Sequence, residues 1–292
     1  MSSFARRLIT SATLLAAGCA AHGDDDMGAA VTAVVELPPT ASTATSTASG
    51  SAYVTLESRF DTCEDAGAPG AIWVREVNGE KDARRVTRLD VSALSREALA
   101  QAARAARGEL VLQGTFSVVD GPTAGPFVVV EAWRGLPGVD PLPEDAYLAV
   151  VRGDGHLIAS ELNRRWEHHS LETVALPNPP DWLDVPWLTT RVLERGAVVA
   201  GQLDGWTLHA HQVFVHLPDV VGPCGVYPLD CRKGIATFER DENRCLVPTG
   251  CATPGPCPLY LAQCDPGYLL AWWPTQPRTC LTFRCDPAFL SR

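Results

Sequence analysis

Eight cysteines crowded into the C-terminal segment constrain this chain more than any other feature. They lie within residues 224–285, a stretch that is also dense in proline and glycine, at positions Cys224, Cys231, Cys245, Cys251, Cys257, Cys264, Cys280 and Cys285. A short loop-rich segment has little apolar core, and disulfides that each add roughly 2–4 kcal/mol of stability would compensate for it. The simplest pairing scheme is four disulfides, but spacing alone does not choose the partners.

A zinc site is the alternative explanation for clustered cysteines. Such sites usually place two ligands as Cys-x-x-Cys, whereas the closest pair here, Cys280 and Cys285, is separated by four residues. The spacing therefore favours disulfides, which form and persist in oxidising compartments. We predict a small disulfide-rich loop module over residues 219–292.

Residues 1–18 have the layout of a secretory signal peptide. Arg6 and Arg7 precede an apolar run over residues 8–17, which is too short to cross a bilayer core about 30 Å thick. Cys19 follows directly after small residues and resembles the cysteine of the bacterial lipobox, although leucine is commoner there at the place of Ala16. The resemblance implies diacylglycerol on Cys19, which would begin the mature chain. An ordinary cleaved signal peptide with an incidental cysteine is the alternative.

Residues 19–52 contain an aspartate run followed by a Ser/Thr/Ala-rich stretch without hydrophobic periodicity. Such composition cannot bury enough apolar surface to offset the entropy of ordering, so we predict a flexible tether. The formal net charge of the whole chain is −10, which argues against a nucleic-acid partner. It also argues against contact with anionic lipid except through the acyl chain. The predicted partners are a membrane, through Cys19, and a protein of unknown identity.

A weak internal repeat runs through the middle of the chain. Its two halves share, in the same order, an opening tyrosine, a hydrophobe-Asn pair, an Arg-Gly pair after a predicted helix and a glycine that closes the next apolar run. These are Tyr53 and Tyr147, Val77-Asn78 and Leu162-Asn163, Arg107-Gly108 and Arg195-Gly196, and Gly114 and Gly201. Each half predicts strand, strand, helix, strand, strand. We therefore expect an α+β domain over residues 53–218, a duplicated ββαββ unit with mainly antiparallel sheet and two helices.

The helix of the first half has clear end signals. Ser95 is a good N-cap, Glu97 suits the first turn, and Gly108 is placed to end the helix. In the second half Pro186 predicts a helix start at about Trp187.

The middle segment resembles an uncharacterised domain family of secreted and lipid-anchored bacterial proteins, chiefly myxobacterial. The likeness rests on the opening tyrosine strand, Cys63, "REVN", a Leu-Asp-x-Ser-x-Leu run before the Ala-rich helix, "LVLQGTF" and "VVVEAWR". Members often carry further cysteines near the second strand, and this chain has only Cys63 there. The family has no known activity, so the resemblance implies a fold and a location without a chemistry.

His209 and His211 are the clearest candidates for a metal site, because alternate residues of a strand share a face. His168, His169 or Asp204 could complete the ligand set, while His216 falls on the opposite face. The alternative is an exposed polar face of an edge strand.

No motif for a nucleophile, a zinc-dependent hydrolase or a phosphate loop is present in the sequence. Four tryptophans of the second half are expected to be core or loop-anchoring groups, and three acidic residues there carry no signal that separates them from surface carboxylates. These are Trp166, Trp182, Trp187 and Trp206, and Asp181, Asp184 and Glu194. We therefore predict no catalytic residue, no cofactor and no enzymatic activity.

Residues 257–287 resemble small antistasin-type inhibitor modules in Cys257-Pro258, in Cys264 followed by Gly267-Tyr268, and in a closing cysteine pair. The wider spacing of that closing pair departs from the family pattern. The resemblance implies that Arg278 would face a protease, and the adjacent Trp272-Trp273 pair would suit either a contact surface or half-buried anchors.

Together these features predict a lipid-anchored lipoprotein of the cell envelope, with a non-enzymatic binding or structural role. The alternatives are a protease inhibitor that acts through the tail and a metal-dependent protein that uses His209 and His211. Cys63 is left without an assigned partner.

Overall fold

The computed structural model describes residues 50–57, 72–117, 125–153, 156–164, 167–176, 183–219, 224–225, 229–259 and 262–290. The predicted signal peptide, Cys19, nearly all of the tether, Cys63, Trp166, Asp181 and Trp182 lie outside these residues. All the described residues belong to one unit of the chain, Thr45–Arg292.

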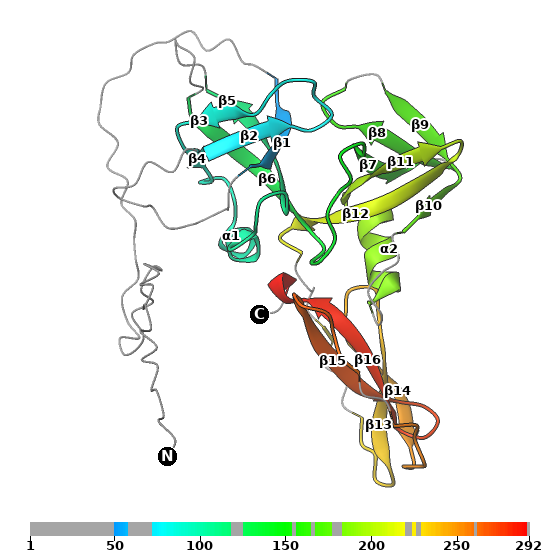
Figure 1. The fold of residues 1–292 in the computed structure, drawn as a ribbon. Coiled ribbons are helices and arrows are strands. Elements are labelled where there is room, and N and C mark those ends of the chain that lie inside the picture. The colour runs from blue at the N-terminus through cyan, green and yellow to red at the C-terminus, as the bar shows by residue number, and fades with distance from the viewer. Residues whose placement is uncertain are drawn as a thin grey trace, which may run out of the picture. The chain divides into compact units, whose positions relative to one another are not determined.

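One large sheet dominates the described part of the chain. Its main path runs β3-β2-β1-β5-β6-β12-β11-β7-β8-β9, with β4 beside β6 and β10 beside β12 (Figure 1). Only these last two pairings are parallel, so the expected mainly antiparallel α+β fold is confirmed. The strands are β1 (Ala52–Leu56), β2 (Ile72–Glu76), β3 (Arg84–Val86), β4 (Leu89–Asp90), β5 (Leu110–Phe116), β6 (Phe127–Gly135), β7 (Ala146–Arg152), β8 (Leu157–Glu161), β9 (His168–Leu171), β10 (Thr173–Ala175), β11 (Val198–Asp204) and β12 (Thr207–Leu217).

Two α-helices occur among the described residues, as the sequence predicts. Helix α1 (Arg96–Ala102) is capped by the Ser95 hydroxyl, which accepts from Ala98 N, but it ends before the expected Gly108. Helix α2 (Val185–Glu194) is capped by Asp184 and begins earlier than predicted. A proline fits in the first turn because the N–H groups there have no intrahelical partner in any case.

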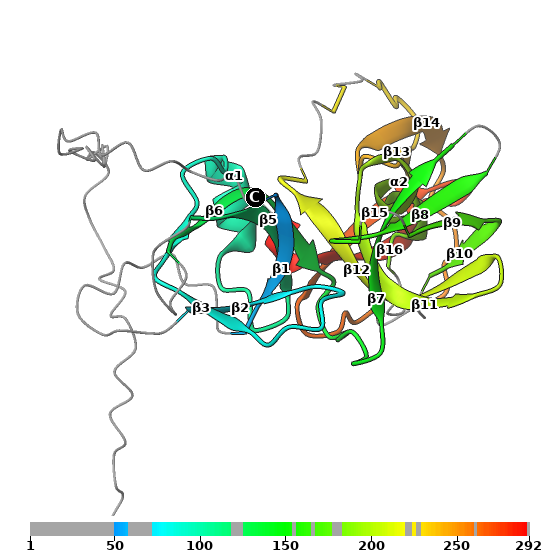
Figure 2. The same cartoon turned by 90° about the horizontal axis from the view of Figure 1, so that it is seen from above.

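The strands are arranged in the same order outward from the central β6–β12 pair on either side. One side runs β6, β5, β1, β2, β3 and the other runs β12, β11, β7, β8, β9 (Figures 1 and 2). Gly114 and Gly201 both lie at register shifts, of β5 against β6 and of β11 against β12. An added Cβ would collide with the carbonyl oxygen of Val128 or of His209, respectively, which explains why glycine occupies both positions.

Asn78 and Asn163 form reciprocal contacts between the two halves of the sheet. The Asn78 side chain accepts from Tyr147 N at 2.8 Å and donates to Tyr147 O at 2.7 Å. The Asn163 side chain makes the same pair of bonds with Tyr53, at 2.8 and 2.7 Å. Both asparagines have positive φ, 54° and 63°, a conformation that asparagine tolerates better than most residues. An asparagine side chain of each half is therefore hydrogen-bonded to the backbone of the first strand of the other half.

Replacing Asn78 by alanine is expected to lower the free energy of unfolding by about 2–4 kcal/mol. The hydrogen bonds to Tyr147 are lost, and alanine is less favourable than asparagine at the positive φ of this position. Asn78→Gly keeps the φ and loses only the bonds, so it should cost about 1 kcal/mol less. Urea denaturation with the disulfides intact measures both values. Equal stability of Asn78→Ala and the wild type would show that these bonds do not hold the halves together.

Three apolar clusters fill the described unit. One lies under α1 and another under α2, on β-branched and leucine side chains of the neighbouring strands. The third contains residues of both halves, including the tilted ring pairs Tyr53–Trp133 and Tyr147–Phe214, whose centroids are 5.6 and 5.7 Å apart. This third cluster joins the halves through side chains.

The C-terminal region contains two hairpins, where a loop module was expected. They are β13 (Ile235–Arg240) with β14 (Leu246–Ala252), and β15 (Tyr268–Thr275) with β16 (Cys280–Pro287), followed by the 3-10 helix η1 (Ala288–Leu290). The predicted cluster of four disulfides is confirmed. Its pairs are Cys224–Cys245, Cys231–Cys251, Cys257–Cys280 and Cys264–Cys285, so two interleaved bridges brace each hairpin.

Candidate functional site

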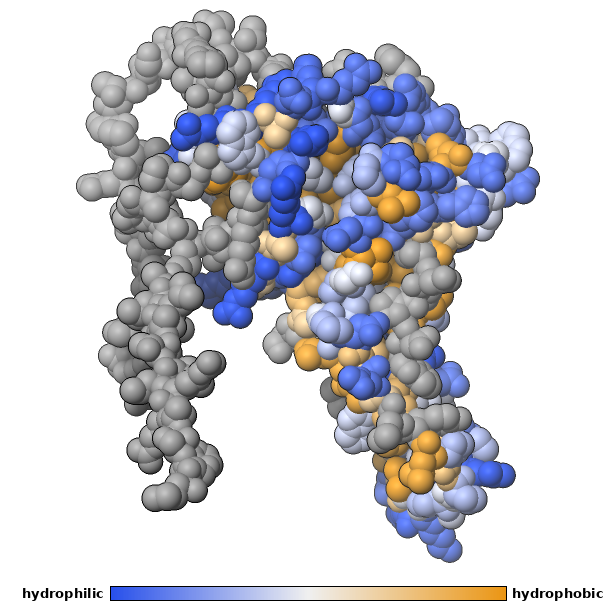
Figure 3. Space-filling model, in the orientation of Figure 1, coloured by the Kyte–Doolittle hydropathy of each residue, from blue (hydrophilic) through white to orange (hydrophobic). Residues whose placement is uncertain are grey.

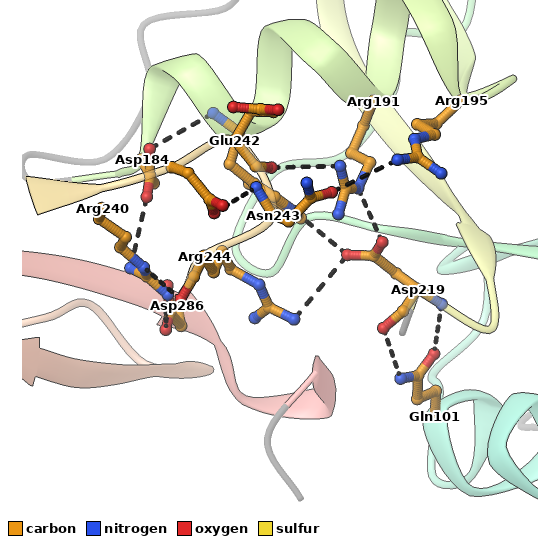
Figure 4. Close-up of polar contacts among 12 residues, drawn as sticks. Gln101, Asp184, Arg191, Arg195, Asp219, Arg240, Glu242, Asn243, Arg244 and Asp286 are labelled. Carbon is orange, nitrogen blue, oxygen red and sulfur yellow. Dashed lines mark hydrogen bonds and ion pairs between the residues drawn. The ribbon is translucent and has the colours of Figure 1, made fainter. Parts of the chain in front are cut away.

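Six buried charged side chains meet where the C-terminal hairpins contact α2 and the end of β12 (Figure 4). The side chains are 3–18% exposed, and they comprise three arginines and three aspartates: Arg191, Arg240, Arg244, Asp184, Asp219 and Asp286. We call this group the buried ion network. Its formal charges balance, which suits burial, since an uncompensated charge in the interior is costly.

Asp219 joins four parts of the chain. Its carboxylate accepts from Arg191 Nε at 2.7 Å and from Trp187 Nε1 at 3.1 Å, both on α2. Its backbone N–H and C=O pair with the side chain of Gln101 on α1, at 2.9 and 3.1 Å. Arg244 Nη2, in the turn of the first hairpin, lies 3.9 Å from the same carboxylate. Asp219 thereby ties the end of β12 to both helices and to the β13–β14 turn.

Arg240 performs a similar role between the two hairpins. Its guanidinium donates to Asp286 on β16 at 2.6 Å and lies 3.4 Å from the helix-capping carboxylate of Asp184. The guanidinium also lies over the ring of Trp273, 5.4 Å from the centroid. Figure 4 shows Arg240 with Asp286 and Asp184, which lie on β16 and at the start of α2, while Trp273 lies on β15.

Two arginines of the network lie near the ring of Trp187. Arg191 and Arg244 are 5.8 and 5.6 Å from its ring, within the range in which a cation is attracted by an aromatic face. Arg191 also donates to the carbonyl of Glu242, at 3.3 Å, in the β13–β14 turn. Trp187 is fully buried, as predicted for the tryptophans of the second half, whereas Trp206 is 61% exposed and does not belong to the core.

Burial sets the electrostatics of the network. Desolvation is the largest influence on Asp184 and raises its pKa against the attraction of Arg240. Desolvation likewise lowers the pKa of Arg244, opposed mainly by Asp286 and Asp219. Arg240 Nη1 and two nitrogens of Arg244 have no hydrogen-bond partner within the described parts of the chain. The network therefore acts as a clamp, in which ion pairs between poorly hydrated side chains fix the hairpins to α2 and to the end of β12.

The two candidate histidines do not belong to a metal-ligand cluster within the described residues. His211 Nδ1 is 2.7 Å from the fully buried carboxylate of Asp145, while His209 is exposed. The register shift of β11 against β12 leaves His211 without a strand partner and breaks the alternation on which the prediction depended. Of the other proposed ligands, His168 contacts Ser160, and His169 lies 3.5 Å from Glu161. Within the described ranges no three His, Cys, Asp or Glu side chains are grouped to hold a metal.

The tail residues singled out from the sequence have contrasting environments. Arg278 is exposed in the β15–β16 turn, and its carbonyl accepts from Gly255 N at 3.1 Å. A substrate-like inhibitor presents that carbonyl to the oxyanion hole of the protease, so this internal bond does not favour inhibition at Arg278. Trp272 is 60% exposed, whereas Trp273 is 5% exposed beneath Arg240.

A groove of about 680 Å³ opens beside α2. Leucine and valine side chains from the second half of the sheet and from the helix line it, together with the polar side chains of Arg152, His156, Glu172, Thr173 and Thr189. None of these polar side chains belongs to the buried ion network.

The four disulfides indicate that the protein folds in an oxidising environment. Over the described residues, the structure contains no helix that is both long and apolar enough to span a bilayer.

Comparison with known proteins supplies no activity. No family model matches the chain, and no solved structure matches it. An uncharacterized protein of Dictyostelium discoideum is 31% identical over 145 residues, which cover 47% of this chain and 50% of that protein. The chain thus spans about half the length of this relative.

Proposed function

We propose that this chain is an exported bacterial lipoprotein, held in the cell envelope by diacylglycerol on Cys19, with a non-enzymatic binding or structural role. The observation that carries the proposal is the way the disulfide-braced hairpins are fixed to the sheet by the buried ion network. Such a construction holds a surface in place without presenting a reactive group. The support for the lipid anchor is the lipobox-like leader of the sequence and the composition of the tether that follows it.

The matching strand order and the reciprocal asparagine contacts support an origin of the sheet by duplication of a ββαββ unit. They are also compatible with the resemblance to the lipid-anchored family of unknown activity. The two alternative functions have weaker support. Inhibition of a protease would require Arg278 to release its carbonyl from Gly255. Metal binding would require His209 or His211 to belong to a group of at least three ligand side chains, and the described residues contain no such group.

Substitution of Cys19 tests the anchor. In cells that export the protein, Cys19→Ala should move it from the membrane fraction to the soluble fraction or leave its leader uncleaved, because no thiol remains to accept the lipid. Detergent phase partition followed by immunoblotting measures the distribution. Cys63→Ala, which removes the cysteine predicted to lie outside both the anchor and the disulfides, is the matched control and should stay in the membrane fraction. An unchanged distribution of Cys19→Ala with its leader removed would refute lipid anchoring.

A further inference from the structure

The β15–β16 hairpin has one face without any charged side chain. Directly opposed residues of an antiparallel pair share a face, and the pairing register places the charged Arg284 and Asp286 on the other one. The uncharged face carries the opposed pairs Tyr268 with Pro287, Leu270 with Cys285, Trp272 with Phe283, and Pro274 with Leu281.

This uncharged face divides into a buried base and an exposed outer part. Tyr268 and Cys285 are packed in the core cluster under α2. Further along, Leu270, Trp272 and Leu281 are 42%, 60% and 45% exposed. We call these three residues the apolar patch. Figure 3 shows apolar residues at the surface of the region formed by the C-terminal hairpins, in contrast to the mainly hydrophilic surface over the first half of the sheet.

The size of the apolar patch argues against a stable dimer through it. Three side chains exposed to this extent offer roughly 300 Å² for burial, compared with the ~800 Å² per partner of a stable protein interface. Exposed apolar side chains on a rigid element instead suit partial burial at a membrane surface, where tryptophan is favoured at the head-group level. The patch requires no backbone to enter the hydrocarbon, so the unpaired edges of the hairpin can stay hydrated.

We propose that the apolar patch inserts into the head-group region of the bilayer to which the chain is anchored. This inference rests on the proposed lipid anchor, which keeps the patch at a high effective concentration near the bilayer. Arg278 is exposed at the turn of the same hairpin, and a cationic side chain there would suit lipid phosphates at the head-group level. The net charge of −10 gives anionic lipid no general attraction for the protein, so insertion should occur in zwitterionic bilayers.

The test uses the full lipidated protein reconstituted into phosphatidylcholine vesicles that contain lipids brominated near the head group, which quench nearby tryptophans. We expect quenching in the wild type and loss of most of it in Trp272→Phe. Trp206→Phe is the matched control, because Trp206 is 61% exposed in the turn between β11 and β12 and should contribute no quenching. Leu281→Ser keeps the Trp272 reporter and should also reduce its quenching.

Equal quenching in Trp272→Phe and the wild type, or none in either, would overturn the insertion while the protein remains incorporated through its lipid. A protein that does not enter the vesicles at all would overturn both the insertion and the proposed anchor. A concentration-dependent mass in sedimentation that Trp272→Phe abolishes would assign the patch to a second copy of the chain and would also overturn the insertion.

Discussion

Asp219→Asn is expected to lower the free energy of unfolding by about 3–5 kcal/mol. The substitution keeps the shape of the side chain but removes the charge that compensates Arg191, at 2.7 Å, and Arg244, at 3.9 Å. Both guanidinium groups are almost fully buried, so neither can recover its hydration without opening the contact between the hairpins and the sheet. Urea denaturation under non-reducing conditions measures the loss.

Asp184→Asn is the matched control for this prediction, and it is expected to cost less than about 1 kcal/mol. The raised pKa of Asp184 means that burial disfavours its charge at neutral pH by more than Arg240 favours it. Asparagine caps a helix as well as aspartate does, and Arg240 retains Asp286 at 2.6 Å. The carboxylate of Asp184 is protonated at a higher pH in the folded protein than in the unfolded chain. As the pH falls from the raised pKa of the folded protein to the ordinary pKa of an aspartate, protonation of Asp184 therefore increases the free energy of unfolding. Equal losses for the two variants would contradict the clamp.

Removal of the Cys264–Cys285 disulfide, as a double alanine variant, is expected to cost about 4–5 kcal/mol, at the upper end of the range for native disulfides. Cys285 is fully buried and packs with Tyr268 and Leu290 in the core under α2, so its loss also leaves a small cavity.

The Cys231–Cys251 disulfide provides the control. The two bridges span 21 and 20 residues, so their effects on the entropy of the unfolded chain are nearly equal. Cys251 is exposed, and its loss leaves no cavity, so we expect the double alanine variant to cost about 2–3 kcal/mol. Thermal unfolding compares the pair. A larger loss for the Cys231–Cys251 variant would show that the second hairpin is not part of the core.

The features predicted correctly from the sequence are those with local signals. Ser95 capped its helix as expected because the cap and the amide it accepts from are three residues apart. The density of proline and glycine predicts loops in the tail, whereas runs such as Tyr268–Thr275 pair as strands. The pairing of the cysteines depends on those hairpins and has no signal in the spacing.

The candidate site had no comparable signal. Arg191 and Asp219 meet across 28 positions, and Arg240 and Asp286 across 46, so no sequence window contains both partners. A balanced set of isolated charges is indistinguishable from surface residues until the fold buries it. The metal site considered as an alternative for His209 and His211 depends on regular alternation along one strand, and the register shift at His211 interrupts that alternation.

The cysteines of the native protein, purified from membranes and alkylated without reduction, can be mapped by mass spectrometry to test both the anchor and the disulfides. We expect diacylglycerol on Cys19, together with the four pairs Cys224–Cys245, Cys231–Cys251, Cys257–Cys280 and Cys264–Cys285 in the peptide masses. An unmodified Cys19, or tail cysteines that alkylate freely, would contradict this expectation.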